Sequence, residues 1–281
     1  MLLCVKSTIV GETRMNDKPF LLIDADVFAY KAAAGAERII TFDNEWYFPA
    51  CSILDAEDAF LSMLLPILEE FDVDMEKDCA FCFSTDRNGG FRRGVLPSYK
   101  TNRDGKARPV ALKFLREKLM SGRSVIPAHS VYLRPGLEAD DCLGILSTQK
   151  SYQKGRQKII VSIDKDMKSL PGYFYNIGHP EEGVLFVSEE EADHWFMKQT
   201  LMGDTTDGYG GCPGVGPKGA DKVLADCKSL SEMWAAVVKA YDKAGLSEEY
   251  ALQQARVARI LRAEDYDFHN KQVKLWRPDH G

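Results

Sequence analysis

Acidic residues recur in this sequence at points where apolar segments begin or end. The segment LEADDCLG holds Glu138, Asp140 and Asp141 directly before apolar residues, and the apolar segments LLID and IIVSID each close on an aspartate. A solvated acidic surface needs no such apolar neighbours. Two carboxylates about 5 Å apart repel by roughly 3 kcal/mol at an effective dielectric near 20. A folded group of these acids must therefore share bound cations or protons.

The full candidate group has nine carboxylates. Some follow predicted strands, some begin a predicted helix, and two lie in a glycine-rich segment: Asp24, Asp86, Asp164, Asp166, Glu138, Asp140, Asp141, Asp204 and Asp207. Taken singly, each also fits a turn or a helix cap. If they converge, Mg²⁺ or Mn²⁺ fits best, because these ions prefer oxygen ligands and no His or Cys lies in the group. Two such ions about 4 Å apart can hydrolyse phosphodiesters.

A basic segment lies beside this group. Between Arg87 and Lys118 there are ten Lys or Arg residues and two acids, a local charge of +8 in a chain whose net charge is −6. Lys and Arg contact phosphates, and aromatic rings stack on unpaired bases. A solvated loop is the alternative interpretation. The predicted nucleic-acid contacts of this segment are Arg92, Arg93, Tyr99, Lys100, Arg103 and Lys106.

The segment GVGPKGA is a glycine-rich turn that opens a helix. Such a turn lets backbone amides approach phosphates, and Lys218 stands at the predicted helix start. With Gly214 and Gly216, it resembles the helix–hairpin–helix clamps that bind the DNA backbone without reading sequence. The alternative is a helix start that packs on another helix.

The elements that must position these residues alternate along the chain. We predict strands over 20–24, 78–86, 129–135, 157–166, 173–178 and 184–188, a hairpin around Asp43-Asn44, and helices from 55 to 71, 110 to 120 and 138 to 150. We interpret Asp26 as a helix cap, and from Ser188 onward we expect helices only. This alternation predicts an α/β fold with a mostly parallel sheet, in which sites gather at the carboxyl ends of strands.

The composition limits the class of protein. Of 281 residues, 45% are apolar, so a sizeable core is available, and no run is long and apolar enough to cross a bilayer. The first residues lack the features of a signal peptide, so we expect a tail on a cytoplasmic protein. Cys79 and Cys82 lie in a predicted buried strand, and we expect inert thiols there.

The order of motifs resembles the flap endonuclease/5′-nuclease family, and most closely the 5′→3′ exonucleases of T-odd podophages. The matching segments are LLIDAD, FSTD with FRRGVLPSYKTNR, LEADD, IIVSIDKD and GDTTDGYGGCPGVGPKGA. The resemblance implies a PIN-like α/β core flanked by helices over 20–187, with a basic arch over 87–120. It also implies a helix–three-turn–helix DNA-binding region over 188–281, after a tail over 1–19.

The resemblance also implies individual roles. A first ion would be bound by Asp24, Asp86, Glu138, Asp140 and Asp141, with Asp164 shared, and a second by Asp166, Asp204 and Asp207. Lys100 and Arg103, at the foot of the arch, would draw in the scissile phosphate, and Tyr99 would stack near the terminal base. The carbonyls of the glycine-rich turn would bind a K⁺ ion.

The function implied is metal-dependent 5′→3′ exonuclease and flap endonuclease action on DNA and on RNA in RNA–DNA hybrids. Phage replication proteins would be partners, in primer removal, recombination or host DNA degradation. One alternative is a haloacid-dehalogenase-type phosphatase, in which Asp24 would be a covalent nucleophile. A second is a DNA-binding module without catalysis.

Overall fold

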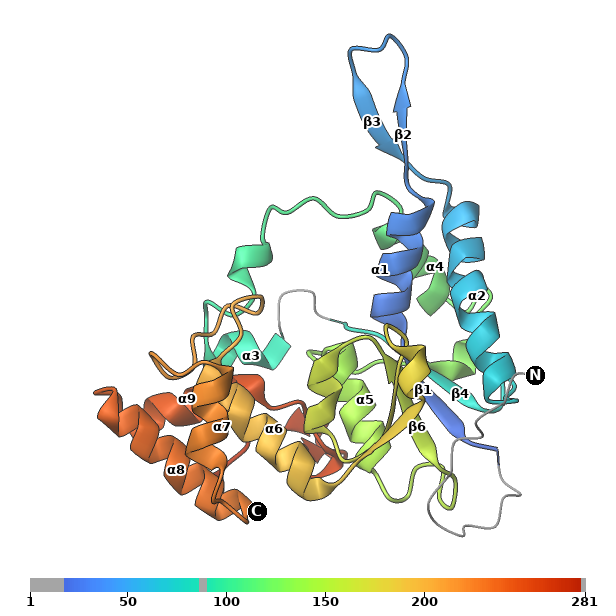
Figure 1. The fold of residues 1–281 in the computed structure, drawn as a ribbon. Coiled ribbons are helices and arrows are strands. Elements are labelled where there is room, and N and C mark those ends of the chain that lie inside the picture. The colour runs from blue at the N-terminus through green and yellow to red at the C-terminus, as the bar shows by residue number, and fades with distance from the viewer. Residues whose placement is uncertain (1–17, 86–89, 279–281) are drawn as a thin grey trace, which may run out of the picture.

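A six-stranded sheet forms the centre of the protein in the computed structural model, which describes residues 18–85 and 90–278 (Figure 1). Its order is β5-β4-β1-β6-β7-β8, and every neighbouring pair is parallel except β7 and β8. The strands are β5 (Val131–Tyr132), β4 (Cys79–Cys82), β1 (Phe20–Asp24), β6 (Lys158–Ser162), β7 (Gly172–Asn176) and β8 (Val184–Val187). The prediction of a mostly parallel α/β fold is confirmed.

Helices cover both faces of this sheet. One face packs against α1 (Ala25–Ala36), α2 (Ile53–Glu70) and α4 (Leu112–Met120), and the other against α5 (Ala139–Thr148). All five residues of β1 are buried, because its side chains enter an apolar cluster on each face. A continuous apolar strand is typical of a parallel sheet covered on both sides.

The C-terminal helices have an apolar cluster of their own. They are α6 (Glu189–Met202), α7 (Pro217–Leu224), α8 (Leu230–Lys243) and α9 (Glu248–Ala258). Trp276 closes this cluster by edge contacts with the rings of Phe196 and Trp234. Tyr99 also belongs to the cluster, so the basic segment is packed onto the C-terminal helices.

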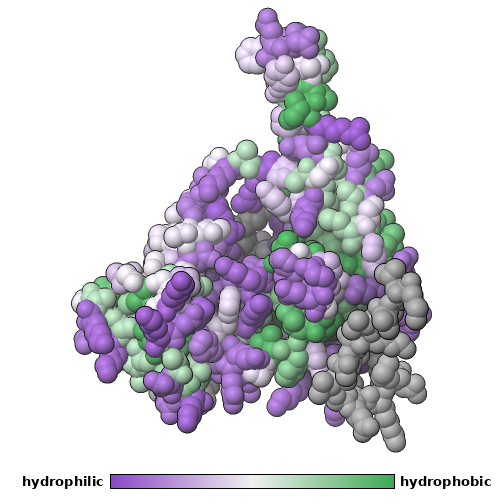
Figure 2. All heavy atoms as spheres, viewed as in Figure 1, coloured by the Kyte–Doolittle hydropathy of each residue, from purple (hydrophilic) through white to green (hydrophobic). Residues whose placement is uncertain are grey.

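The basic segment itself begins with α3 (Gly90–Val95) and a 3₁₀ turn, η1 (Thr101–Arg103). The chain then runs in an extended path to α4, next to α1 (Figure 1). The backbone N–H of Val110 donates to Glu37 at the end of α1, 2.8 Å away. Below this path the surface is hollowed and mostly hydrophilic (Figure 2).

A hairpin of β2 (Arg38–Thr41) and β3 (Tyr47–Ala50) projects from the top of α1 and α2 (Figure 1). It confirms the hairpin predicted around Asp43-Asn44. Its strands touch no other strand of the described chain, and Phe42 is 85% exposed.

Several boundaries differ from the prediction. The strand expected over 129–135 is only two residues long, and the one expected over 157–166 ends at Ser162 because a 3₁₀ turn follows. The expectation that strands stop at Ser188 is wrong, since β9 (Tyr266–Asp267) pairs with β10 (Gln272–Val273). The predicted tail lies mostly in residues 1–17, outside the described residues.

Cys79 and Cys82 lie in β4, where burial raises the pKa of both thiols, that of Cys79 to about 12. Neither is paired in a disulfide. None of the helices within 18–85 and 90–278 combines the length and apolarity needed to cross a bilayer.

Candidate active site

The carboxyl ends of β1 and β6 bring two aspartates to the same edge of the sheet. Asp24 ends β1 and caps α1, and its carboxylate accepts hydrogen bonds from the Val27 N–H (3.2 Å) and the Ser162 hydroxyl (2.7 Å). Asp164 follows β6 and caps the turn η3 (Lys165–Ser169), where it accepts the N–H of Asp166 at 2.8 Å. The sequence analysis did not identify Ser162. Its position two residues before Asp164, at the carboxyl end of β6, could have indicated it.

The start of α5 adds Glu138 and Asp140 to this edge. Glu138 is the N-cap of the helix. Asp140 lies in the first turn, and the charged groups that act on it are Asp24, Asp164, Glu138 and Lys100.

The loop between α6 and α7 supplies two more acids in a rigid turn. Asp204 accepts the N–H groups of Thr206 (2.6 Å) and Asp207 (3.3 Å) and pairs with Tyr209 in an isolated bridge. Gly211 has φ +63°, and a Cβ there would collide with the backbone nitrogen of Gly203. The tight crossing of the two glycine backbones fixes where this loop presents its acids.

Burial and mutual repulsion alter the protonation of four of these acids. Burial, followed by the charges of Asp26 and Asp164, raises the pKa of Asp24 to about 7. Burial and then Asp164 and Asp204 raise the pKa of Asp166 to about 7. The pKa values of Asp140 and Asp164 are also raised, mainly by burial. The nearby Lys and Arg side chains therefore do not neutralise all the negative charge that these carboxylates would carry when ionised.

Lys100 is a basic residue whose side chain enters this group. Its ammonium pairs with Glu138 and lies 3.7 Å from Asp207. Burial alone would lower the pKa of Lys100, but these two carboxylates outweigh it and raise the pKa. Burial would likewise raise the pKa of Glu138, but Lys100 and Arg92 hold it below its usual value. Arg103 pairs with Asp207 at the rim.

Divalent ions fit this donor set in charge and chemistry. The donors are carboxylate oxygens, which hard cations prefer, and Asp166 Oδ1 is buried with no hydrogen-bond partner among the described residues. Within 18–85 and 90–278 no three His, Cys, Asp or Glu side chains stand close enough to hold an ion as they are. Asp86, predicted as a further ligand, lies outside the described residues.

The structure differs from the predictions for Asp141 and Arg92. Both oxygens of Asp141 accept from the guanidinium of Arg92 at 2.7 Å, so this carboxylate is already occupied. Arg92 is only 2% exposed and cannot reach DNA. Asp141 was predicted as a metal ligand and Arg92 as a DNA contact, each from its position in a motif, but their side chains point toward each other.

Tyr99 also differs from its prediction. Its ring is 2% exposed, inside the apolar cluster of the C-terminal helices, and cannot stack on a base. Its hydroxyl lies 3.0 Å from Glu138 and 3.1 Å from Asp207, so it bridges the two parts of the acidic group. The partly buried Arg93 donates to the Tyr99 carbonyl at 3.0 Å.

Asp26 is not the cap that we expected, because Asp24 caps α1. Instead Asp26 accepts the Ser84 N–H at 3.0 Å, and its carboxylate lies 2.7 Å from Arg116 Nε. It therefore holds the segment after β4 beside the acidic edge.

The glycine-rich turn lies at the start of α7. Gly214 has φ +78°, Gly216 is the N-cap, and Pro217 is the first residue of the helix. Lys218 is exposed in the first turn. Gly216 and Pro217 are exposed as well, so the start of the helix is open to solvent, where a helix N-terminus can bind an anion.

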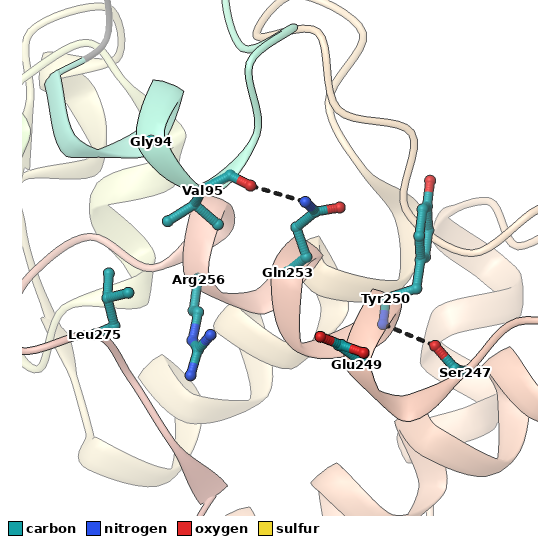
Figure 3. Close-up of a pocket in the computed structure, with 8 residues that line it drawn as sticks. All are labelled: Gly94, Val95, Ser247, Glu249, Tyr250, Gln253, Arg256 and Leu275. Carbon is teal, nitrogen blue, oxygen red and sulfur yellow. Dashed lines mark hydrogen bonds between the residues drawn. The ribbon is translucent and has the colours of Figure 1, made fainter.

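Two cavities lie near these elements. One of about 510 Å³ is beside Asp164 and is lined also by Lys165, Lys168 and His179. The other, of about 470 Å³, lies between α3 and α9 and contains none of the predicted site residues (Figure 3).

A mostly parallel sheet, helices on both faces and carboxylates at one edge define a PIN-like α/β protein. Residues 19–184 match the family described as the 5′-3′ exonuclease, N-terminal resolvase-like domain. The chain belongs to this 5′→3′ exonuclease family.

Individual relatives agree with this membership. The exonuclease of Escherichia phage T7 is 27% identical over 290 residues, covering 94% of this chain and 95% of its own. Two solved structures of phage T5 proteins share the fold at 14% identity, each with a TM-score of 0.60 and 85% of this chain covered. One is the 5′-exonuclease with bound zinc, of which 89% is covered. The other is a flap endonuclease in a complex with DNA and metal ions, of which 88% is covered.

The family membership and the geometry of Asp24 both argue against the phosphatase alternative. A covalent nucleophile must reach the substrate, whereas Asp24 is 2% exposed and is held by Ser162 and by the start of α1.

Proposed function

We propose that this protein is a divalent-metal-dependent 5′→3′ exonuclease and flap endonuclease. The observation that carries the proposal is the acidic edge, where several buried carboxyls with raised pKa values meet in a member of the 5′→3′ exonuclease family. Bound cations would stabilise the ionised carboxylates against the burial and the mutual repulsion that raise these pKa values.

Two Mg²⁺ ions, for which Mn²⁺ can substitute, are the proposed cofactors. Their proposed ligands are Asp24, Asp86, Glu138, Asp140, Asp164, Asp166, Asp204 and Asp207. When bound, such ions supply the positive charge that activates water and stabilises the leaving oxygen of a phosphodiester. Asp141 supports the group through Arg92 and is not among the ligands that we propose.

Lys100 and Arg103 are the proposed residues for holding the scissile phosphate. Both now donate to carboxylates, Lys100 to Glu138 and Arg103 to Asp207. A substrate phosphate at the mouth of the site offers the same kind of acceptor, so it competes for these N–H groups. In the free protein these two side chains pair with carboxylates, and in the proposed complex they would pair with the substrate phosphate.

The start of α7 is the proposed grip on the duplex. The exposed Lys218 and the exposed helix start at Gly216 suit a backbone phosphate. We include in the proposal a K⁺ ion bound by the carbonyls of this turn. Contacts of this kind carry no sequence information, which suits an enzyme that acts on any 5′ end.

The proposed substrates are DNA with 5′ ends or flaps and RNA in RNA–DNA hybrids. The relative aligned over nearly its whole length is an exonuclease of phage T7, and this supports the proposal of a phage nuclease. The proposed role is in phage DNA replication, beside other replication proteins. Primer removal, recombination and host DNA degradation are the processes that need such an activity.

Digestion of 5′-labelled duplex, flap and RNA–DNA hybrid substrates tests the proposal. We expect 5′-phosphorylated products with Mg²⁺ or Mn²⁺ and none with EDTA. Asp164→Ala should lower turnover by orders of magnitude while DNA binding in Ca²⁺ persists, because the variant keeps the duplex grip. Normal turnover of this variant, or cleavage in EDTA, would contradict the assignment.

A further inference from the structure

The guanidinium of Arg92 is buried at the meeting point of three segments. It comes from α3, and each of its five N–H groups has an acceptor. Nε donates to the Val257 carbonyl (2.9 Å), and the two terminal nitrogens donate to Glu138 (3.2 Å), to both oxygens of Asp141 (2.7 Å each) and to the Arg259 carbonyl (2.7 Å).

These acceptors belong to parts of the chain that are far apart in sequence. Glu138 and Asp141 open α5, whereas the two carbonyls belong to the end of α9 and the residues after it. Asp141 completes the junction, since its carboxylate also accepts the N–H groups of Glu138 and Leu261, each at 3.2 Å. The start of α5 is therefore docked on the end of α9 through one ion pair.

The shape of the guanidinium explains why an arginine stands here. A planar fork with five donors can satisfy two carboxylates and two carbonyls at once, whereas an ammonium has only three donors on a flexible stem. A buried charge persists only if it is paired and hydrogen-bonded in this way.

A second contact joins α3 to α9. Gln253 of α9 donates to the Val95 carbonyl at the end of α3 (2.7 Å), and a cavity of about 470 Å³ opens beside this bond (Figure 3). Arg92 and the Val95 carbonyl therefore both join α3 to α9.

We infer that Arg92 is a positioning residue, which aims the Glu138 carboxylate into the acidic group and makes that aim depend on the docking of α9. The inference rests on the proposed function, because it takes Glu138 as a ligand of a divalent ion. Partners that orient a ligand in this way change metal affinity by roughly 10–100-fold when they are replaced.

Arg92→Lys tests the inference in the full-length protein. We expect Mn²⁺ binding without DNA, measured by EPR, to weaken about tenfold, while affinity for 5′-labelled duplex in Ca²⁺ stays unchanged. Arg156→Lys is the matched control, because the Arg156 guanidinium also donates to a carboxylate, that of Asp78, and to backbone carbonyls, but just before β1 begins, away from the acidic edge. It should lose thermal stability and keep wild-type Mn²⁺ affinity.

Two results would overturn the inference alone: a folded Arg92→Lys that binds Mn²⁺ as tightly as wild type, or an Arg156→Lys that weakens Mn²⁺ binding equally. If Arg92→Lys does not fold, Arg92→Gln combined with Asp141→Asn removes both buried charges and carries the same expectation. Failure of both variants to fold would make Arg92 a stability residue only and would also overturn it. A wild-type protein that neither binds Mn²⁺ nor degrades duplex would instead overturn the proposed function.

Discussion

Asp24 and Asp166 differ from ordinary surface aspartates because burial raises the pKa of each from 3.8 to about 7. A carboxyl with a higher pKa in the folded state binds more protons when folded, at any pH between its two pKa values. The free energy of unfolding therefore falls as pH rises from about 4 to about 7.

Removal of divalent ions by a chelator should make the melting temperature depend on pH. In EDTA the melting temperature should be higher at pH 5.5 than at pH 7.5, and Mg²⁺ should shrink this difference because cations stabilise the ionised carboxylates. Differential scanning calorimetry checks both parts. The double variant Asp24→Asn with Asp166→Asn should lose part of the pH dependence, because Asp140 and Asp164, whose pKa values are also raised, remain. A melting temperature that rises with pH in EDTA would count against the assignment.

Residue type and spacing predicted which acids come together, but not where each side chain points. On an ideal helix Glu138 and Asp141 share a face, so they would be the expected pair. In the structure Asp140 faces Asp24 and Asp164, while Asp141 is turned to Arg92. The direction depends on α9 docking against α5, a contact between segments more than 100 residues apart that no local pattern carries.

Among the helices and loops, the turn between α6 and α7 shows how glycine positions acids. Gly203 and Gly211 both have positive φ and cross within backbone contact, whereas a Cβ at the adjacent Gly210 would meet nothing within 4 Å. The sequence showed a glycine-rich segment, but it did not show at which positions the backbone conformation admits only glycine. The hairpin at Asp43-Asn44 was easier to predict, since its signal lies entirely within one turn.

The second prediction compares these neighbours. Gly211→Ala should lower the free energy of unfolding by about 2 kcal/mol, because it adds both a steric clash and left-handed strain. It should also lower nuclease activity, because Asp204 and Asp207 would shift. Gly210→Ala should change neither by much. Urea unfolding and single-turnover cleavage measure the two effects, and equal losses in both variants would contradict this account of the loop.

Across the whole protein, charge is divided unevenly. The net charge is −6, yet the basic segment and the start of α7 place cations around the acidic edge. Such a distribution repels nucleic acid in general and attracts it along one path.

The third prediction follows from that path. Lys218→Ala should weaken duplex binding and reduce the slope of log affinity against log salt by about one phosphate contact. Fluorescence anisotropy in Ca²⁺ over a range of KCl concentrations measures the slope. Lys239→Ala, on α8, provides a charge-matched control. An unchanged slope for Lys218→Ala would remove this residue from the duplex grip.

The hairpin of β2 and β3 has a practical consequence. Arg38 pairs with Ala50 at its base, so the chain leaves the body and returns to it at adjacent points. Below them, α1 and α2 are held together by Phe28 and Phe60, whose ring centroids are 5.9 Å apart. Residues 39–49 can therefore be exchanged for a short loop, or for an affinity tag, without disturbing the sheet. The shortened protein would lack Phe42 and Trp46, two exposed aromatic side chains that favour aggregation during purification.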